Sequence, residues 1–213
     1  ERGIQKQAAT VVTQTVVDSN DPAFQNPTKP IGSFMDESLA MEKRQKDGWV
    51  VVEDAGRGWR RVVPSPIPQT IVEAAAIRSL IDNGFVVVAV GGGGIPVMQH
   101  EDGSLVGVEA VIDKDFGSAI LASMLNADLF LISTAVEKVA INFNKPDQKW
   151  LDEMTVADAQ KYIEEGQFAK GSMLPKIQAI LKYMAAGGKK ALITDPEHIK
   201  DALDGKTGTW IVP

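Results

Sequence analysis

Two lysines in this chain stand where they could hold an anion by positive charge. Lys114 lies between Asp113 and Asp115 in VIDKDFGSA, and Lys176 lies in the first turn of a predicted helix in GSMLPKIQ. A cation near a helix N-terminus is mildly unfavourable because the macrodipole is positive there, and a bound anion would remove the conflict. Two such lysines on separate helices favour a clamp on a phosphoryl group, whose transfer depends on positioned charge. The alternative for Lys114 is a solvated lysine balanced by two acids.

A third lysine, Lys29, is braced by Pro27 and Pro30 in the segment NPTKPIG. Flanking prolines reduce backbone freedom, which would suit a lysine that a lid delivers to the site. The alternative is an ordinary loop lysine.

Four consecutive glycines, Gly91, Gly92, Gly93 and Gly94, follow the apolar run FVVVAV. Ligands of parallel sheets lie beyond the carboxyl ends of the strands, and a glycine backbone lets an anion approach N–H groups closely. The run is no Walker loop, since no Gly-Lys-Ser/Thr follows, and it is no dinucleotide fingerprint, since Pro96 follows at once. The glycines alone therefore predict an anion or nucleotide site without deciding between them, with a flexible strand exit as the alternative.

The predicted secondary structure around these residues falls into two stretches. Residues 25–68 are rich in Pro, Gly, charge and Trp, which predicts a small β-containing excursion with turns at 47–48 and 55–58. Its segment GWRR is interpreted as a solvated turn, with a basic patch as the alternative.

From residue 69 onward, predicted strands and helices alternate. Val72, Ala76 and Leu80 share one face of a helix that ends at Gly84, and the run FVVVAV suits a strand buried on both faces. The remaining pattern predicts strands at 128–133, 191–194 and 209–212 and helices at 116–126, 172–186 and 196–203. A further helix is predicted to begin at a capping box from Thr155 to Asp158. The helix at 172–186 is expected to bury a stripe of Ile177, Ile180, Leu181 and Met184. This alternation favours a mostly parallel sheet covered by helices on both faces.

Composition excludes several classes of function. The 213 residues are 44% hydrophobic and 23% charged, which is ordinary soluble globular material, and the net charge of -6 argues against nucleic acid as a partner. The chain has no Cys, so disulfides and thiolate chemistry are excluded. No apolar stretch approaches the roughly 20 residues that span a bilayer, and the chain does not open on a signal peptide. No cluster has metal-ligand spacing, so any Mg²⁺ is expected to come with nucleotide phosphates.

Seven segments together resemble carbamate kinase, in that family's order and over nearly the whole chain. They are NPTKPIG, RRVVPSP, GGGGIPV, GVEAVIDKDF, NKPDQ, EEGQFAKGSMLPK and GKTGTWI. The resemblance implies reversible phosphoryl transfer between ATP and carbamate, giving ADP and carbamoyl phosphate, with Mg²⁺ carried by the nucleotide. It also implies the amino-acid-kinase fold, a three-layer α/β/α sandwich with a mostly parallel central sheet and a small protruding lid. The family consists of cytoplasmic homodimers, and its reaction belongs to arginine metabolism.

The resemblance also assigns roles to residues of this chain. It implies that Lys29 lies on the lid, that Lys114 and Lys176 contact the transferring phosphoryl group, and that Asp115 orients the lysines with Asp113 beside it. The glycines 91–94 are expected to line the phosphoryl-transfer cleft. Thr134 and Val136 in LISTAVEKV are candidates for the nucleotide's base and ribose, and Met173 is another.

The resemblance implies three regions and one departure. Residues 1–24 would belong to the core, 25–68 would form the lid, and 69–213 would form the nucleotide-binding core. The family's first strand and its GGNA-type glycine loop, which contacts phosphate and carbamate, have no counterpart in this sequence. Roughly the N-terminal third of a full-length member is therefore expected to be absent, and with it about half of the groups that surround the phosphate, the phosphate cradle. A chain short of that cradle is expected to be impaired in catalysis. The alternatives are another acylphosphate-forming amino acid kinase and a truncated, non-catalytic nucleotide-binding module.

Overall fold

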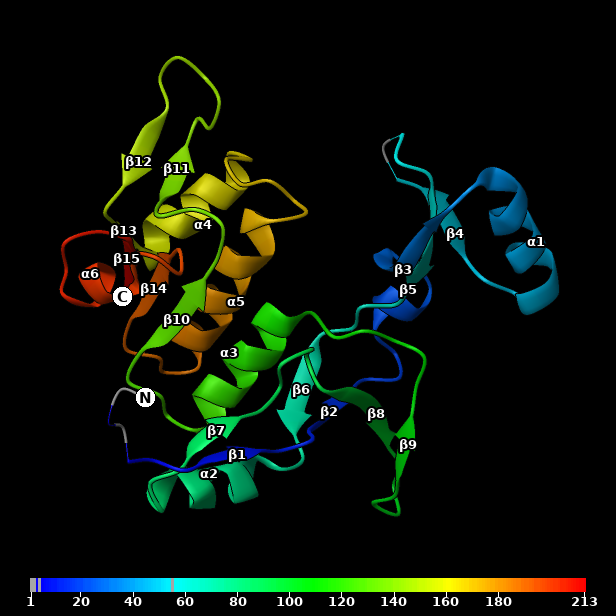
Figure 1. The fold of residues 1–213 in the computed structure, drawn as a ribbon, viewed down its shortest axis with the longest axis horizontal. Helices are drawn as coiled ribbons and strands as arrows, with labels where there is room; N and C mark the ends of the chain where they lie inside the picture. Colours follow the sequence, from blue (N-terminus) through cyan, green and yellow to red (C-terminus); the bar gives the residue numbers. More distant parts are fainter. Residues whose placement is uncertain (1–2, 4, 55) are drawn as a thin grey trace. The chain divides into compact units, whose positions relative to one another are not determined.

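The computed structural model describes residue 3 and residues 5–54 and 56–213. The chain divides into two compact units, one that runs as far as Lys114 and one that covers Asp115–Pro213. Strands and helices occur in both units, and six α-helices lie in the described residues (Figure 1). The predicted α/β class, with parallel strand pairs, is confirmed. None of the helices in the described part of the chain has both the length and the apolar character that a membrane crossing requires.

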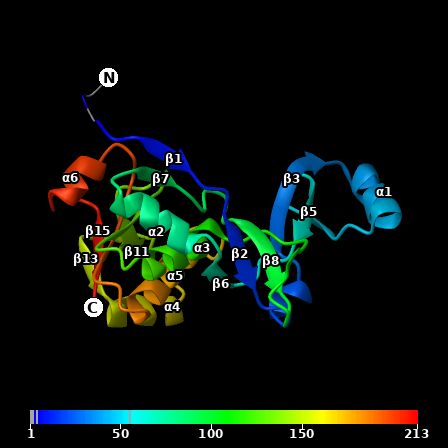
Figure 2. The same ribbon diagram turned by 90° about the horizontal axis from the view of Figure 1, so that it is seen from below.

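The first unit contains a four-stranded sheet and a separate parallel strand pair. The elements are β1 (Ala8–Thr10), β2 (Gln14–Val17), β6 (Pro68–Ile71), α2 (Ala74–Asp82), β7 (Val86–Val88), β8 (Ile95–Gln99) and β9 (Leu105–Gly107). The larger sheet has the order β6-β2-β8-β9, in which β2 and β8 are parallel. The smaller pair joins β1 to β7, and α2 packs beside it (Figure 2).

The prediction that the run FVVVAV is buried on both faces is wrong. Val86 and Val88 are 49% and 53% exposed, whereas Val87 between them is half-buried. Successive side chains of a strand point to opposite faces. Only the face of β7 that carries Val87 is therefore covered.

The predicted buried face of the first long helix is also wrong. Residues 68–71 pair with β2 as a strand, so α2 begins only at Ala74 and leaves Val72 outside the helix. The buried residues of α2 are Ala74 and Ile77, while Ala76 is exposed. The helix ends as predicted before Gly84, whose φ of 84° lies in the left-handed region.

A second sheet of the first unit lies within residues 29–63 and is called here the small sheet. It consists of β3 (Lys29–Met35), β5 (Trp59–Val63) and β4 (Val51–Glu53) in the order β3-β5-β4, all antiparallel. A short 3₁₀ turn, η1 (Pro22–Phe24), precedes it, and α1 (Glu37–Asp47) joins β3 to β4. The segment GWRR is not a solvated turn, because Trp59 opens β5 and both arginines lie within that strand. The predicted turn at 55–58 falls partly on Ala55, outside the described residues.

The helix α1 is the element that the sequence pattern missed. Only Ala40 of this helix is buried, so it has no apolar stripe to signal it. It is defined by its ends: the Asp36 side chain accepts from the Leu39 N–H at 2.8 Å, and Gly48 ends the helix with a φ of 68°. The predicted turn at 47–48 is this C-terminal cap.

The second unit is a four-stranded sheet covered by helices, with a projecting hairpin. Its strands are β10 (Phe130–Ser133), β11 (Val139–Ile141), β12 (Lys149–Leu151), β13 (Glu153–Thr155), β14 (Ala191–Thr194) and β15 (Thr209–Val212), and its helices are α3 (Lys114–Met124), α4 (Val156–Glu164), α5 (Met173–Ala185) and α6 (Ile199–Leu203). The sheet order is β10-β14-β15-β13, and β11 and β12 form the hairpin (Figure 1). Helices α4 and α5 pack against each other and against β13 and β10, respectively.

The core of the second unit confirms the predicted stripe of α5. Ile177 and Ile180 are fully buried, Met184 is buried, and Leu181 packs partly against the same core. The predicted capping box is present, since the Thr155 hydroxyl and the Asp158 carboxylate bond each other's backbone N–H groups. The capping box fixes the start of α4, whereas α5, which carries Lys176, is held by its buried stripe.

Candidate functional site

Lys176 and Asp115 form an ion pair inside the second unit. Lys176 lies in the first turn of α5, Asp115 lies in the first turn of α3, and the lysine Nζ is 3.0 Å from the Asp115 Oδ2. The two side chains are 18% and 13% exposed, which makes this pair less accessible than the pair of Lys29 with Asp113. The acid also offsets the unfavourable position of a cation at a helix N-terminus. Because α3 begins at Lys114, Asp115 is the second residue of the helix.

Lys29 and Asp113 form a similar pair inside the first unit. The Lys29 Nζ lies 2.8 Å from the Asp113 Oδ2, and the side chains are 30% and 17% exposed. Lys29 is the first residue of β3, so it lies on a strand rather than in a loop. Its position is therefore set by the small sheet.

Asp113, Lys114 and Asp115 are consecutive, yet the two acids do not simply neutralise the lysine between them. Asp113 pairs with Lys29 of the first unit, and Asp115 pairs with Lys176 of the second. The Lys114 side chain is exposed. The tripeptide thus anchors one lysine in each unit and leaves a third at the solvent surface.

The four glycines separate into two kinds. Gly93 has a φ of 101°, and a Cβ added to it would lie 2.5 Å from the Ile112 carbonyl oxygen. Gly94 has a φ of 86°, and a Cβ added to it would lie 2.2 Å from the Thr15 Oγ1. Both are therefore required by backbone conformation and packing. At Gly91 and Gly92 an added Cβ meets nothing within 4 Å. These two leave open space in front of the backbone.

The turn before the glycines is strained. Val90 has a φ of 55°, which a β-branched residue rarely adopts, and it is 2% exposed. Its N–H donates to the Thr13 Oγ1 at 3.1 Å, and its carbonyl accepts from the Gly93 N–H at 2.9 Å. The Thr15 hydroxyl donates to the Gly93 carbonyl at 2.8 Å. Strain of this kind persists only where surrounding contacts enforce it, and it clusters at functional sites.

A cavity of about 370 Å³ opens in the second unit. Its wall combines the β11–β12 hairpin, the segment after α4 and the start of α5. Val136 and Met173 line it, together with Phe143, Trp150 and Phe168. Thr134 is not part of this wall, and its backbone N–H donates to the Thr194 carbonyl at 2.8 Å. Trp150 is 48% exposed, so it lines the cavity instead of filling a core.

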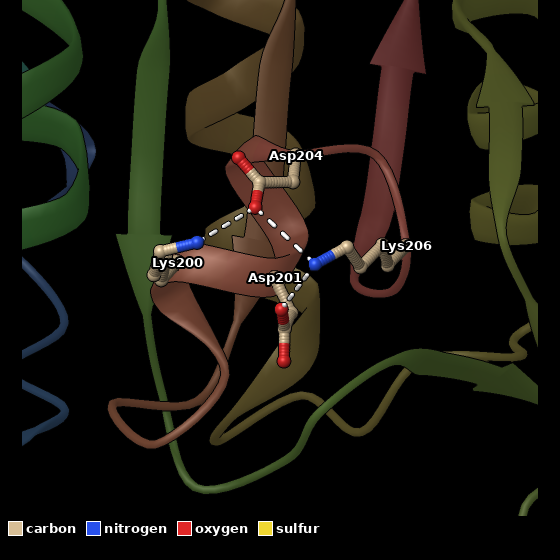
Figure 3. Close-up of polar contacts among 4 residues, drawn as sticks. All are labelled: Lys200, Asp201, Asp204 and Lys206. Atoms are coloured by element: carbon tan, nitrogen blue, oxygen red, sulfur yellow. Dashed lines mark hydrogen bonds and ion pairs between the residues drawn. The ribbon is translucent and has the colours of Figure 1, made fainter.

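A network of surface charges holds the turn that follows α6. Lys206 lies 3.0 Å from Asp201 and 3.4 Å from Asp204, and Lys200 lies 2.9 Å from Asp204 (Figure 3). Hydrogen bonds from Lys200 and Lys206 hold the pKa of Asp204 below its ordinary value. Thr207 directly follows Lys206, and its hydroxyl donates a hydrogen bond to the Glu137 carboxylate.

Glu137 directly follows Val136 of the cavity wall. The segment GKTGTWI therefore contacts the segment LISTAVEKV, although the two lie 70 positions apart. Spacing alone gave no signal for this contact, nor for the ion pairs of Asp113 and Asp115 with lysines far along the chain.

Comparisons with known proteins agree with this fold. Residues 34–195 match the Amino acid kinase family. The chain is 53% identical to the carbamate kinase of Thermococcus kodakarensis over 212 residues, covering 100% of this chain and 67% of the relative. It is 57% identical to the carbamate kinase of Clostridium perfringens over 214 residues, covering 100% of this chain and 68% of the relative. A solved structure, carbamate kinase from Giardia lamblia bound to AMP-PNP, superposes with a TM-score of 0.89 at 44% identity, over 97% of this chain and 66% of that one.

The chain therefore belongs to the amino acid kinase family and has its fold. Within that family it is similar to carbamate kinases over its whole length, so the resemblance predicted from the seven segments is confirmed. The chain spans about two thirds of the length of these relatives.

Proposed function

We propose that this protein is a carbamate kinase, which transfers a phosphoryl group reversibly between ATP and carbamate. The observation that carries the proposal is the identity of 53% and 57% to carbamate kinases along the whole chain. The related structure with AMP-PNP, an ATP analogue, supports ATP as the phosphoryl donor.

The charges at the candidate site suit this chemistry. A carboxylate oxygen of carbamate forms a bond to the γ-phosphorus of ATP, and the bond between that phosphorus and the β–γ bridging oxygen breaks, which releases ADP. The nucleophile is already an anion, so the reaction needs no residue to remove a proton. Its main requirement is positive charge around the phosphoryl oxygens.

We assign Lys29, Lys114 and Lys176 to the transferred phosphoryl group. Asp113 and Asp115 act as orienting residues, because each accepts an ion pair from one of these lysines. A lysine whose stem and ammonium are already fixed loses less side-chain entropy when the substrate binds. The backbone at Gly91 and Gly92, where no side chain intrudes, is assigned to anion contact, with Gly93 and Gly94 shaping the turn.

We assign the nucleotide base and ribose to the cavity of the second unit. Its mixture of aromatic side chains with a few polar groups is typical of small-molecule sites. Val136 and Met173 line it, and Thr134 remains a predicted contact.

Mg²⁺ is expected to accompany the nucleotide. Among the described residues, no group of three or more His, Cys, Asp or Glu side chains is arranged to hold a metal ion. The proposal is that the ion is bound mainly through the substrate phosphates, where it would neutralise developing charge. Small-molecule substrates, a homodimer, a cytoplasmic location and a place in arginine metabolism are further predictions from the resemblance.

The test is ATP formation from ADP, Mg²⁺ and carbamoyl phosphate, read by luciferase light. The proposal predicts ATP with carbamoyl phosphate and none with the acyl phosphates of amino acids. ATP formed only from the latter would identify another amino acid kinase. Binding of ADP without any ATP formation would instead support a non-catalytic nucleotide-binding module.

A further inference from the structure

Three contacts in the described part of the chain join the small sheet, or the residue directly after it, to residues 109–113, and one of them involves a lysine of the proposed phosphoryl site. Lys29 pairs with Asp113 at 2.8 Å. The Arg61 guanidinium forms an ion pair with the Glu109 carboxylate. Between these two pairs, the Val111 N–H donates to the carbonyl of Pro64, directly after β5, at 2.9 Å.

Lys29 and Arg61 lie on the same face of the small sheet. In the register of β3 and β5, Lys29 is opposite Val63, and residues directly opposite each other share a face. Arg61 is two positions from Val63 on the same strand, so it also points to that face. One face of the sheet thus presents both cations to a five-residue segment that carries an acid at each end.

Arg61 is held more firmly than an ordinary surface arginine. Its guanidinium carbon lies 4.6 Å from the ring centroid of Trp49, and its side chain is 26% exposed. Stacking on an aromatic ring and a carboxylate partner together fix the planar group in one orientation. Glu109 is 69% exposed, so the arginine supplies the fixed half of the pair.

The same segment also packs against the glycine turn. Ile112 is 1% exposed, and a Cβ on Gly93 would lie 2.9 Å from its Cβ and 2.5 Å from its carbonyl oxygen. Residues 109–113 therefore contact both the small sheet and the turn that carries Gly91 and Gly92. A shift of the small sheet along this segment would move Lys29 relative to that turn.

We propose that Arg61 is a positioning residue for Lys29. Its ion pair with Glu109 sets where the small sheet lies along residues 109–113, and this keeps the Lys29 ammonium on Asp113. The claim that Arg61 affects turnover, the catalytic half of the inference, rests on the proposed function. The claim that Arg61 holds Lys29 in place, the structural half, does not. Arg61 itself contacts neither substrate nor phosphoryl group in this account.

The structural half is tested by the ¹⁵N–¹H signal of the Lys29 ammonium, assigned by its loss in Lys29→Arg. In Glu109→Gln and in Arg61→Met, ammonium proton exchange should rise about two- to fivefold, the range for losing a partly exposed ion pair. Arg57→Met is the matched control, because Arg57 pairs with Asp54 at 2.7 Å and lies over Phe34 without involving residues 109–113. An unchanged Lys29 signal in both test variants, or an equal rise in the control, would overturn the inference.

The catalytic half is tested in the ATP-forming assay. Glu109→Gln should lower kcat by about the same two- to fivefold and leave the KM for ADP unchanged, and Arg61→Lys should recover part of the loss seen in Arg61→Met. A loss that appears in KM for ADP instead would contradict a role through Lys29. If the unaltered protein forms no ATP, the proposed function fails, and the ammonium measurement still decides whether Arg61 holds Lys29.

Discussion

Two regions of the second unit contain lysine–aspartate pairs of nearly the same length and very different surroundings. Lys176 lies 3.0 Å from Asp115, and Lys206 lies 3.0 Å from Asp201. The first pair is 18% and 13% exposed and joins the first turns of two helices. The second is 62% and 52% exposed and belongs to the network around α6 in Figure 3.

Distance alone therefore does not assign a role to an ion pair. An exposed pair gains little, because water and salt screen it and two long side chains lose freedom. A lysine that is largely withdrawn from water and held at a helix N-terminus, by contrast, places its ammonium group where an anion could bind. The exposed fraction of the side chains and the elements that they join, rather than the Nζ–Oδ distance, distinguish the Lys176–Asp115 pair from the surface network.

The largest expected effect is on turnover. Lys176→Ala and Lys114→Ala should each lower kcat for ATP formation on the order of 10²-fold or more, the range for removing one preorganised donor from a transition state. The folded state should survive both changes, as judged by melting curves. Near-normal turnover in either variant would remove that lysine from the proposed clamp.

The next effect separates the crowded glycines from the open ones. Gly93→Val should lower the free energy of unfolding by at least about 1–3 kcal/mol, the range for overpacking, because its added atoms collide with Ile112. Gly92→Val should leave the melting temperature nearly unchanged and weaken phosphate and ADP binding. A Gly92→Val protein that binds both normally would leave the glycine turn without a role in anion contact.

A smaller effect is expected at His198, whose exposure is intermediate between the two regions. Its Nδ1 lies 2.8 Å from the Asp195 Oδ1, and this hydrogen bond raises the pKa of His198 above its ordinary value of 6.5. While Asp195 is ionised, the pair's contribution to stability is therefore full below about pH 6.5 and is lost as the pH rises through the higher folded-state pKa of His198. An NMR titration should show the raised midpoint, and Asp195→Asn should lower it. No change in Asp195→Asn would reject the carboxylate as the cause.

The smallest effect is expected in the surface network. Lys206→Gln should leave both turnover and melting temperature unchanged within error, because its carboxylate partners Asp201 and Asp204 are exposed and screened by solvent. If turnover fell strongly instead, the turn from Gly205 to Gly208 would have to be counted as part of the site.

The sequence predicted the second unit better than the first, for physical reasons. The stripe of α5 and the capping box at Thr155 are local periodic or short-range signals, and both were found in the structure. The helix α1 lacks an apolar face, so only its cap residues could have indicated it. The burial of β7 depends on which faces its neighbours cover, which no local pattern contains.

The candidate site shows the same limit. The lysines and glycines were selected by residue type and by resemblance, but the partners of Asp113 and Asp115 lie 84 and 61 positions away in sequence. The proposed role of Arg61 could not be predicted from the sequence, because GWRR has the composition of a turn. Its strand position follows from pairing with both β3 and β4.

The most direct test of the account is calorimetric binding of ADP by three variants measured together, Lys29→Ala, Lys176→Ala and Lys206→Ala. Lys176 belongs to the helix α5, whose first residue, Met173, lines the cavity, so its loss should weaken ADP binding. Lys29 belongs to the small sheet and is assigned to the transferred phosphoryl group, so its loss should lower turnover and leave ADP affinity nearly intact. Lys206→Ala should bind as the unaltered protein does. Equal weakening in Lys206→Ala and Lys176→Ala, or in Lys29→Ala and Lys176→Ala, would contradict the account.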